Sequence, residues 1–218
     1  MYYLLGDLKE KLKCDLLIIN QFFSESPKDY LCRVQQSIRD AGSKYDRIVV
    51  LGGNHLSILP VYRWLYEYEL LNIVTLDAHR DYYPEGSINH ATFLKELGKK
   101  NTGKHYLVGA RDFDKHAEKH SCIEEITIDA LKNNKSLIDG GIGFLDIDLD
   151  VLDPNEFPWC GSTIDNGLTK EIVMSIIQYA VETHCKILAI SEYIPNWDFS
   201  KTGQSTIIDF VSCFLSHK

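Results

Sequence analysis

The sequence predicts an α/β fold: a three-layer α/β/α architecture around a mainly parallel sheet, with residues 1–218 forming a single domain. Three observations support this fold class. Short apolar runs alternate with helical patterns, as they do in parallel α/β domains. Most of the runs are near-continuous Val, Ile and Leu, which suits strands covered on both faces of the sheet. A length of 218 residues fits one domain with a substantial core.

Seven β-rich runs predict the strands, and five helical patterns fall between or after them. In chain order, the predicted strands are residues 15–20, 47–53, 72–78, 105–111, 124–129, 142–150 and 186–193. The predicted helices are residues 28–41, 57–70, 92–99, 169–184 and 205–216. The fourth helix has a clear start signal, because Thr169 can cap its first turn and Glu171 follows closely.

Composition excludes several classes of protein. The formal net charge of −8 argues against nucleic acid as a partner, because phosphate binding requires a basic face. The apolar runs are far shorter than a membrane span, and the first residues, "MYYLLGDLKEKLKC", do not resemble a secretory signal. The six cysteines show no CxxC motif and no framework spacing, which is typical of reduced thiols. We therefore expect a cytoplasmic protein.

The stretch "LDAHRD" places Asp77, His79 and Asp81 directly behind the apolar run "NIVT". In an extended strand, alternate side chains point to the same side, so the side chains of these three residues would all lie on one face of the strand. A buried strand gains nothing from two carboxylates and an imidazole. A shared metal ion would explain all three.

Three further strand ends carry similar chemistry. They are "LGGNH" (51–55), "LDIDLDVLDP" (145–154) and "SEYIP" (191–195). Each has an ordinary alternative explanation, as a loop histidine, a solvated acidic turn or a strand-end acid. Ligand sites in parallel sheets lie beyond the carboxyl ends of the strands, where all four motifs fall. Their combination indicates a metal site.

These motifs resemble those of the ureohydrolases, the superfamily of arginase, agmatinase and formiminoglutamase. The resemblance runs in family order from about residue 47 to 198 and implies an arginase-like fold. The matching segments are "GGNHL" (52–56), "DAHRD" (77–81), "GARD" (109–112), "DIDLDVLDP" (146–154), "NGLT" (166–169) and "EYIP" (192–195). Asp146 stands in place of the family's serine, Asn54 in place of an aspartate and Leu56 in place of a serine.

The resemblance implies a binuclear Mn²⁺ site in which Asp77 and Asp148 bridge two ions. The expected metal ligands are His55, Asp77, His79, Asp81, Asp148 and Asp150. Four carboxylates with two imidazoles form a hard ligand set that suits Mn²⁺ better than structural zinc. Two ions that share a hydroxide would lower its pKa towards neutrality. We expect Asp146 to contact these ligands without binding metal, and Asp153 to cap the turn before Pro154.

Catalytic roles are expected for His90, Glu192 and Asp150. Glu192 stands where the family places a carboxylate that binds a guanidinium group. His90 resembles the family's proton shuttle, although Ala91 replaces the glycine that follows it; a helix-start histidine is the alternative. Hydrolysis of a guanidino C–N bond would release urea.

The choice of substrate depends on the short loop "YYPEGSIN" (82–89), which lacks the polar side chains that bind the carboxylate of free arginine in arginases. We expect Tyr82, Tyr83 and Asp114 to contact a substrate, and peptidyl arginine, converted to ornithine, to be preferred. The alternatives are free arginine, agmatine, a small guanidino acid such as guanidinobutyrate, or a formimino compound. Two further alternatives are a non-catalytic metal-binding module and a zinc amidohydrolase of deacetylase type. The sequence leaves the oligomeric state open.

Overall fold

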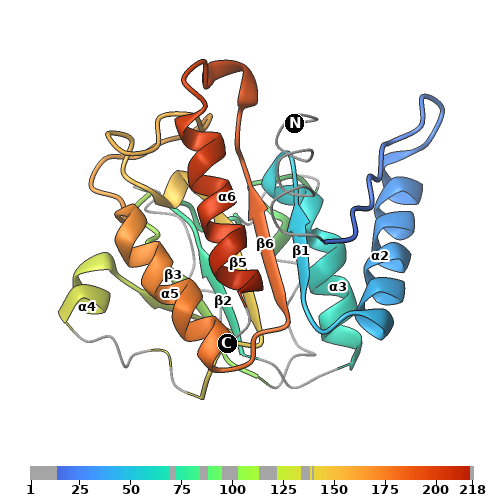
Figure 1. Cartoon of the computed structure of the whole chain (residues 1–218), viewed down its shortest axis with the longest axis horizontal. Coiled ribbons are helices and arrows are strands. Elements are labelled where there is room, and N and C mark those ends of the chain that lie inside the picture. Colours follow the sequence, from blue (N-terminus) through green and yellow to red (C-terminus); the bar gives the residue numbers. More distant parts are fainter. Residues whose placement is uncertain are drawn as a thin grey trace.

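The fold was analysed in a computed structural model of the chain. The structure describes residues 14–68, 72–83, 88–94, 103–112, 122–133, 138 and 140–216. Within these residues the elements form one mainly parallel sheet with helices on both faces (Figure 1). That residues 1–218 form a single domain stays a prediction.

The sheet has six parallel strands in the order β1-β6-β5-β2-β3-β4. The strands are β1 (Ile48–Leu51), β2 (Ile73–Leu76), β3 (His105–Val108), β4 (Ile123–Ile126), β5 (Phe144–Asp148) and β6 (Ile187–Ser191). The last two strands of the sequence insert between the first two. The predicted mainly parallel α/β architecture is confirmed.

Within the described residues, five α-helices and three 3₁₀ turns accompany these strands. The helices are α2 (Pro27–Lys44), α3 (Leu59–Tyr68), α4 (Ile128–Asn133), α5 (Lys170–Glu182) and α6 (Thr202–Leu215). The turns are η1 (His55–Ile58), η4 (Leu149–Val151) and η5 (Pro195–Trp197). Figure 1 shows α5 and α6 on one side of the molecule and α2 and α3 on the other.

The strands bury alternate side chains in two cores, one on each face of the sheet. In the first core, Leu145 packs with residues of α5 and α6 that include Ile177 and Phe210. In the second, Phe144 packs with residues of α2 and α3 that include Val61. Neighbouring residues of β5 therefore point to opposite faces, and the sheet is the middle of three layers.

Local signals fix the ends of two helices. Ser26 caps α2 by accepting a hydrogen bond from the backbone N–H of Asp29, and Thr169 caps α5 by accepting one from Ile172. Gly167 precedes the second cap, where a β-carbon would come within 2.4 Å of the backbone of Leu152. Only glycine allows this close approach.

The predicted strand at residues 15–20 is wrong. This segment has no regular structure and is largely exposed. Its carbonyl groups bond to side chains of α2 rather than to a neighbouring strand, since Arg33 donates to the carbonyl of Asn20 and Tyr30 to that of Ile19. The predicted helix at residues 92–99 begins in a turn, and its part beyond residue 94 lies outside the described residues.

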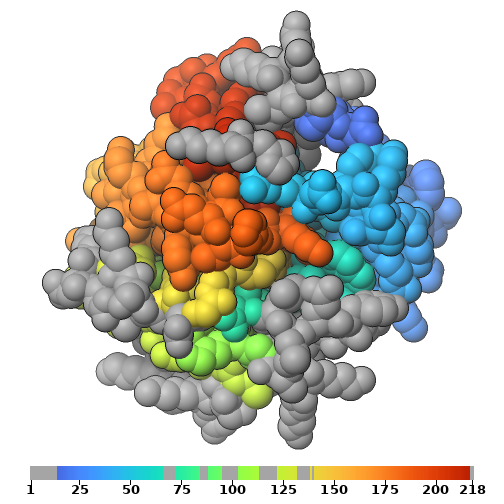
Figure 2. All heavy atoms as spheres, turned by 60° about the horizontal axis from the view of Figure 1, so that its bottom comes forward, coloured from blue at the N-terminus to red at the C-terminus, as the bar shows by residue number. Residues whose placement is uncertain are grey.

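The two ends of the sheet differ in character. At the amino ends of the strands, Asn72, Gly141 and Thr183 line a pocket. Figure 2 shows this end of the molecule, with the chain near β5 in yellow and the chain near β6 in orange. The carboxyl ends carry the motifs of interest. Among the described residues, no helix has both the length and the apolar character needed to cross a membrane.

Candidate metal centre

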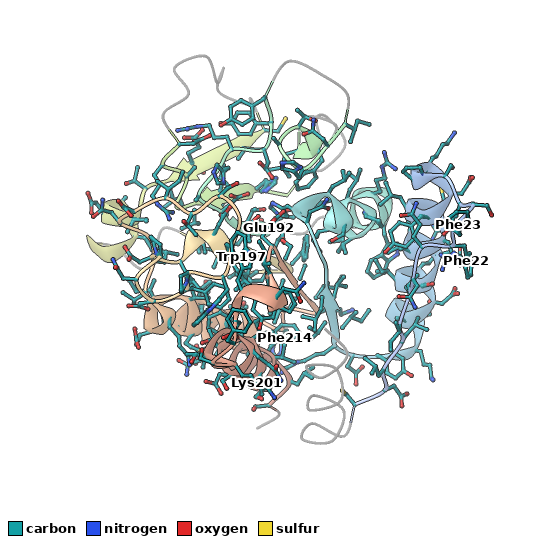
Figure 3. All side chains as sticks on the ribbon, turned by 90° about the horizontal axis from the view of Figure 1, so that it is seen from above. Phe22, Phe23, Glu192, Trp197, Lys201 and Phe214 are labelled. Atoms are coloured by element: carbon teal, nitrogen blue, oxygen red, sulfur yellow. The ribbon has the colours of Figure 1, made fainter. Side chains whose placement is uncertain are left out.

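Four adjacent strands, β1, β6, β5 and β2, deliver the motif residues to one end of the sheet. His55 opens η1, which follows β1, and Asp77 follows β2 directly. Asp148 ends β5, and Glu192 follows β6. Glu192 lies near the middle of this end in Figure 3, which looks down on it.

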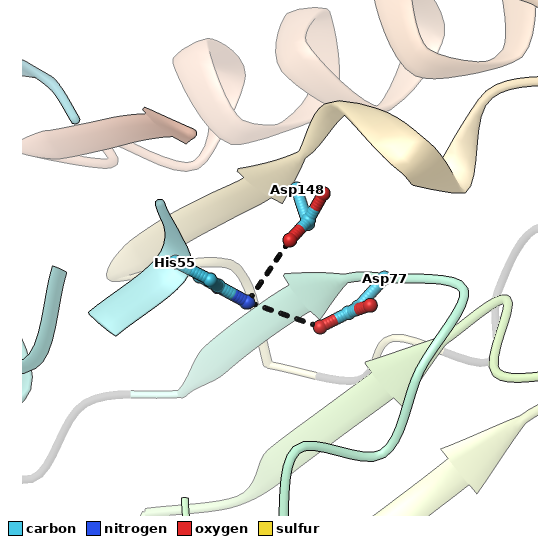
Figure 4. A group of neighbouring side chains, drawn as sticks. All are labelled: His55, Asp77 and Asp148. Carbon is cyan, nitrogen blue, oxygen red and sulfur yellow. Dashed lines mark ion pairs between the residues drawn. The ribbon is translucent and has the colours of Figure 1, made fainter. Parts of the chain in front are cut away.

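The first cluster forms around the Nδ1 atom of His55. This nitrogen lies close to three carboxylate oxygens, which belong to Asp77 (3.1 Å), Asp81 (3.0 Å) and Asp148 (3.1 Å). Figure 4 shows His55, Asp77 and Asp148 converging from three different elements. All four residues are buried.

The second cluster shares Asp77 with the first. Nδ1 of His79 lies 2.9 Å from Oδ2 of Asp150 and 3.6 Å from Oδ1 of Asp77. The two oxygens of Asp77 thus face different clusters, Oδ2 towards His55 and Oδ1 towards His79. Oδ2 of Asp77 is buried without a hydrogen-bond partner among the described residues. A carboxylate in this position suits a bridge between two cations.

The donor set fits divalent ions in both clusters. Ligands about 2.1 Å from an octahedral ion lie about 3.0 Å from their neighbours, close to the spacings around His55 Nδ1. Two groups of potential ligand atoms, all within 4.8 Å of one another, are His55 with Asp77 and Asp148, and Asp77 with His79 and Asp150. Carboxylate and imidazole ligands without thiolates favour a hard ion such as Mn²⁺ or Mg²⁺.

Electrostatics also point to a cation. Burial and the nearby charges of Asp150 and Asp77 raise the pKa of the Asp148 carboxyl well above its usual range. Burial and the charge of Asp77 raise the pKa of Asp81 to about 7, although His55 acts in the opposite direction. Carboxylates crowded in this way repel one another until positive charge is supplied. A bound cation would supply it and keep them ionised.

Backbone turns, rather than extended strands, aim these side chains. β2 ends at Leu76, and Asp81 takes a left-handed conformation with φ of 48°. β5 ends at Asp148, whose side chain accepts from the N–H of Asp150 within η4. The prediction of an extended strand through residues 77–81 is therefore wrong, although it indicated the residues that form the clusters.

Glu192 joins the site through the backbone of the first cluster. Its Oε1 accepts a hydrogen bond of 2.6 Å from the N–H of His55, and its own N–H donates to the carbonyl of Gly53. Its φ of 67° is unusual for a side chain larger than glycine. The loops after β1 and β6 are thereby tied together beside the metal ligands.

The family model "Arginase family" matches residues 3–216. The chain belongs to the arginase family. It is 28% identical to the agmatinase of Blochmanniella floridana over 206 residues, which cover 88% of this chain and 67% of that protein. It is 29% identical to the agmatinase of Bacillus subtilis over 170 residues, which cover 72% of this chain and 58% of that protein.

Solved structures of the arginase family share the fold. An arginase from Bacillus subtilis matches with a TM-score of 0.80 and 20% identity, covering all of this chain and 90% of that one. An agmatine ureohydrolase of Thermoplasma volcanium matches with a TM-score of 0.76 and 19% identity, covering 88% of this chain and 69% of that one. The arginase-like fold is confirmed. Against curated relatives the chain is short, spanning from half to two thirds of their length.

The other residues expected in the site of this arginase-family chain, His90, Tyr82, Tyr83 and Asp114, stay predictions. His90 is exposed in a turn, and no contact joins it to the clusters among the described residues. Tyr82 is 5% exposed, and its hydroxyl donates to Glu125. The hydroxyl of Tyr83 donates to Asp112. Asp114 lies outside the described residues.

Two features of the site were missed or only partly anticipated. Cys160 is buried, and its thiol has a raised pKa because of burial and the nearby charges of Asp148, Asp150 and Glu192. No local sequence signal identifies Cys160, because only the folded chain places its loop near Asp148, Asp150 and Glu192. The sequence predicted that Asp146 would contact the ligand residues, but it did not predict that the buried hydroxyl of Tyr62 would donate to Asp146. Asp153 caps its turn as predicted, accepting from the N–H of Asn155.

Proposed function

We propose that this protein hydrolyses the guanidino group of a small free compound and releases urea, with agmatine as the first candidate substrate. Members of the arginase family are metal-dependent ureohydrolases that act on guanidino groups. The observation that carries the proposal is the pair of carboxylate-rich clusters sharing Asp77. The named agmatinases among its relatives support the choice of agmatine.

The residues that would hold two ions follow from the clusters. His55, Asp77, Asp81 and Asp148 surround one position, and His79, Asp77 and Asp150 surround the other. We also assign Asp148 to both ions, as the family resemblance implies. Two divalent ions, when bound, supply the Lewis acidity that lowers the pKa of water towards neutrality. Mn²⁺ is the ion that we propose.

Glu192 is the proposed guanidinium-binding group. One of its oxygens accepts a hydrogen bond from the N–H of His55, which fixes the carboxylate beside the first cluster. Each carboxylate oxygen can accept more than one hydrogen bond, so the group can still receive two guanidinium N–H donors. The cleavage of the C–N bond leaves an amine that must gain a proton. We assign that proton transfer to Asp150, within the second cluster, and retain His90 as a second candidate.

Peptidyl arginine is the second candidate substrate. It rests on the short loop after Asp81, of which residues 84–87 lie outside the described residues. Neither Tyr82, which is buried, nor the names of the relatives adds support to it. A non-catalytic metal-binding module would have no use for the carboxylate of Glu192 beside the first cluster.

The test is a urea assay with the Mn²⁺-loaded protein. Agmatine, free arginine, 4-guanidinobutyrate and an arginine-containing peptide are supplied separately. The proposal expects urea from agmatine with the highest kcat/KM of the four. Absence of urea from every guanidino compound would overturn the proposal, whereas a preference for the peptide would overturn only the choice of substrate.

A further inference from the structure

A buried chain of hydrogen bonds ends on Asp146, two residues before the metal ligand Asp148. Its members come from β3, β2, α3 and β5, and all are at most 2% exposed. Nε2 of His105 lies 2.9 Å from Oγ1 of Thr75, which lies 2.6 Å from the hydroxyl of Tyr62. That hydroxyl donates to Oδ2 of Asp146 at 2.6 Å.

The same oxygen of Asp146 also contacts the first metal cluster. Nε2 of His55 lies 2.9 Å from Oδ2 of Asp146. An ionised carboxylate can only accept hydrogen bonds, so Nε2 of His55 must carry the proton. Nδ1, on the other side of the ring, is then left with its lone pair towards the three carboxylates of the cluster unless it too is protonated.

The direction of every bond in the chain follows from this end point. Because the hydroxyl of Tyr62 donates to Asp146, it must accept from Oγ1 of Thr75. Thr75 has one hydroxyl proton, so its oxygen accepts from Nε2 of His105. All the donors therefore point towards Asp146. Hydrogen bonds aligned in one direction polarise one another and stabilise the charge on which they end.

We propose that Asp146 is a positioning residue for the first metal ion, and that Tyr62, Thr75 and His105 hold it in place. Asp146 keeps His55 in the tautomer that exposes the lone pair of Nδ1, fixes the plane of the ring and makes the imidazole a stronger ligand. The inference rests on the proposed function, because it presupposes a metal ion beside His55. It concerns this chain in particular, since Asp146 replaces the serine of the resembled family.

A purely structural role explains Asp146 less well. The residue is fully buried, and its Oδ1 has no hydrogen-bond partner among the described residues. Burying an ionised carboxylate is costly, and the removal of a charge from a core is often neutral or stabilising when shape is kept. Asparagine, which has the same shape, would accept the hydrogen bond of Tyr62 at lower cost. A carboxylate is useful here because its charge acts on a histidine that binds a cation.

The experiment compares Asp146→Asn with Asp146→Ser by titrating Mn²⁺ into the metal-free protein in a calorimeter. Asparagine keeps an oxygen that can accept a hydrogen bond from His55 but removes the negative charge. Serine removes the charge and is also too short to contact His55. We expect the affinity of one of the two ions to fall by about 10-fold in the first variant and up to about 100-fold in the second. The affinity of the other ion should change by less than about threefold. The Tm of metal-free Asp146→Asn should stay close to that of the wild type, because asparagine keeps the shape and an acceptor, whereas Asp146→Ser leaves the buried Tyr62 hydroxyl without its acceptor and should have a lower Tm.

A matched pair of tyrosine variants guards against a folding defect. Tyr62→Phe removes the hydroxyl that donates to Asp146 and should lower the affinity for the same ion several-fold. Tyr106→Phe removes the hydroxyl of another buried tyrosine, which has no hydrogen-bond partner among the described residues, and should leave both affinities unchanged. With Zn²⁺ bound, ¹⁵N NMR of the wild type should show His55 protonated at Nε2, and the Nε2–H signal should move upfield in Asp146→Ser.

The outcomes separate the inference from the proposed function. If the wild type binds two ions and the Asp146 variants bind both as tightly, the inference is overturned and the proposed function stands. Equal weakening of both ions in Asp146→Asn, with a lowered metal-free Tm, would assign Asp146 a structural role and also overturn it. If the wild type binds no divalent ion, the proposed function itself fails.

Discussion

Replacement of Asp77 by asparagine isolates the carboxylate that the two clusters share. Asparagine has nearly the same shape, and its Oδ1 can still accept the hydrogen bond of 2.6 Å from the N–H of His79. It cannot supply a negative oxygen to each cluster, as Asp77 does towards His55 and His79. The substitution should therefore lower the affinity of the protein for both ions.

The magnitude follows from the number of ligands. The binding free energy of a structural Zn²⁺ ion in a four-ligand site is about 10 to 16 kcal/mol. One ligand therefore contributes about 2.5 to 4 kcal/mol, and we take the same contribution for Mn²⁺. Each Mn²⁺ affinity should fall about 10²- to 10³-fold. Although burial acts in the opposite direction, the hydrogen bonds and charges of His55 and His79 lower the pKa of Asp77, so the metal-free variant, which lacks this carboxylate, should have a lower Tm than the metal-free wild type.

Metal content after dialysis and calorimetric titration with Mn²⁺ measure this prediction. Asp153→Asn is the matched control, since Asp153 lies in the loop after Asp148 and Asp150 and bonds the backbone of Asn155 and Gly167 rather than a cluster. The control should keep two ions per chain. If Asp77→Asn bound two ions with wild-type affinity, the shared-carboxylate geometry would be wrong.

Three further predictions concern pH, the guanidinium site and substrate choice. Asp81 has its pKa raised to about 7, so below pH 7 a metal ion must displace its proton; the increase in Tm that Mn²⁺ causes should grow from pH 5 to pH 8, and a flat increment would contradict this. Glu192→Gln should lower kcat/KM about 10- to 150-fold for agmatine and arginine alike, with Mn²⁺ content unchanged, because one charge-assisted contact is worth about 1.5 to 3 kcal/mol. Loss of only one substrate would argue that Glu192 binds something other than the guanidinium group. Wild-type protein should favour agmatine over free arginine by at least about tenfold in kcat/KM, and the reverse order would reject agmatine as the preferred substrate.

The sequence could predict which residues form the two clusters, because the motifs that contain them follow strongly apolar strands. Asp77 and Asp148 stand out against "NIVT" and "IGFL", where a buried strand has no need of a carboxylate. The geometry that joins them was not available from the sequence. β5 and β6 return between β1 and β2, and nothing in a local pattern encodes that order. The 3₁₀ turn that brings in Asp150 was equally hidden, because it follows the strand without a break in hydrophobicity.

The supporting chain of Asp146 shows a second limit of sequence patterns. Thr75 and His105 read as ordinary strand residues, and Tyr62 as a helical core residue. Only the register of β2 between β5 and β3 places Thr75 beside Asp146. The prediction of a strand at residues 15–20 was wrong for a different reason. An apolar, β-rich composition indicates a strand but does not show that a partner strand is present.

The most direct test of the binuclear guanidino-hydrolase account is the rate of urea release from agmatine as Mn²⁺ is added stepwise to metal-free protein. The account predicts that the rate rises until two ions are bound per chain and then stays constant. A full rate with one ion or none, or no urea at any ratio of metal to protein, would contradict it.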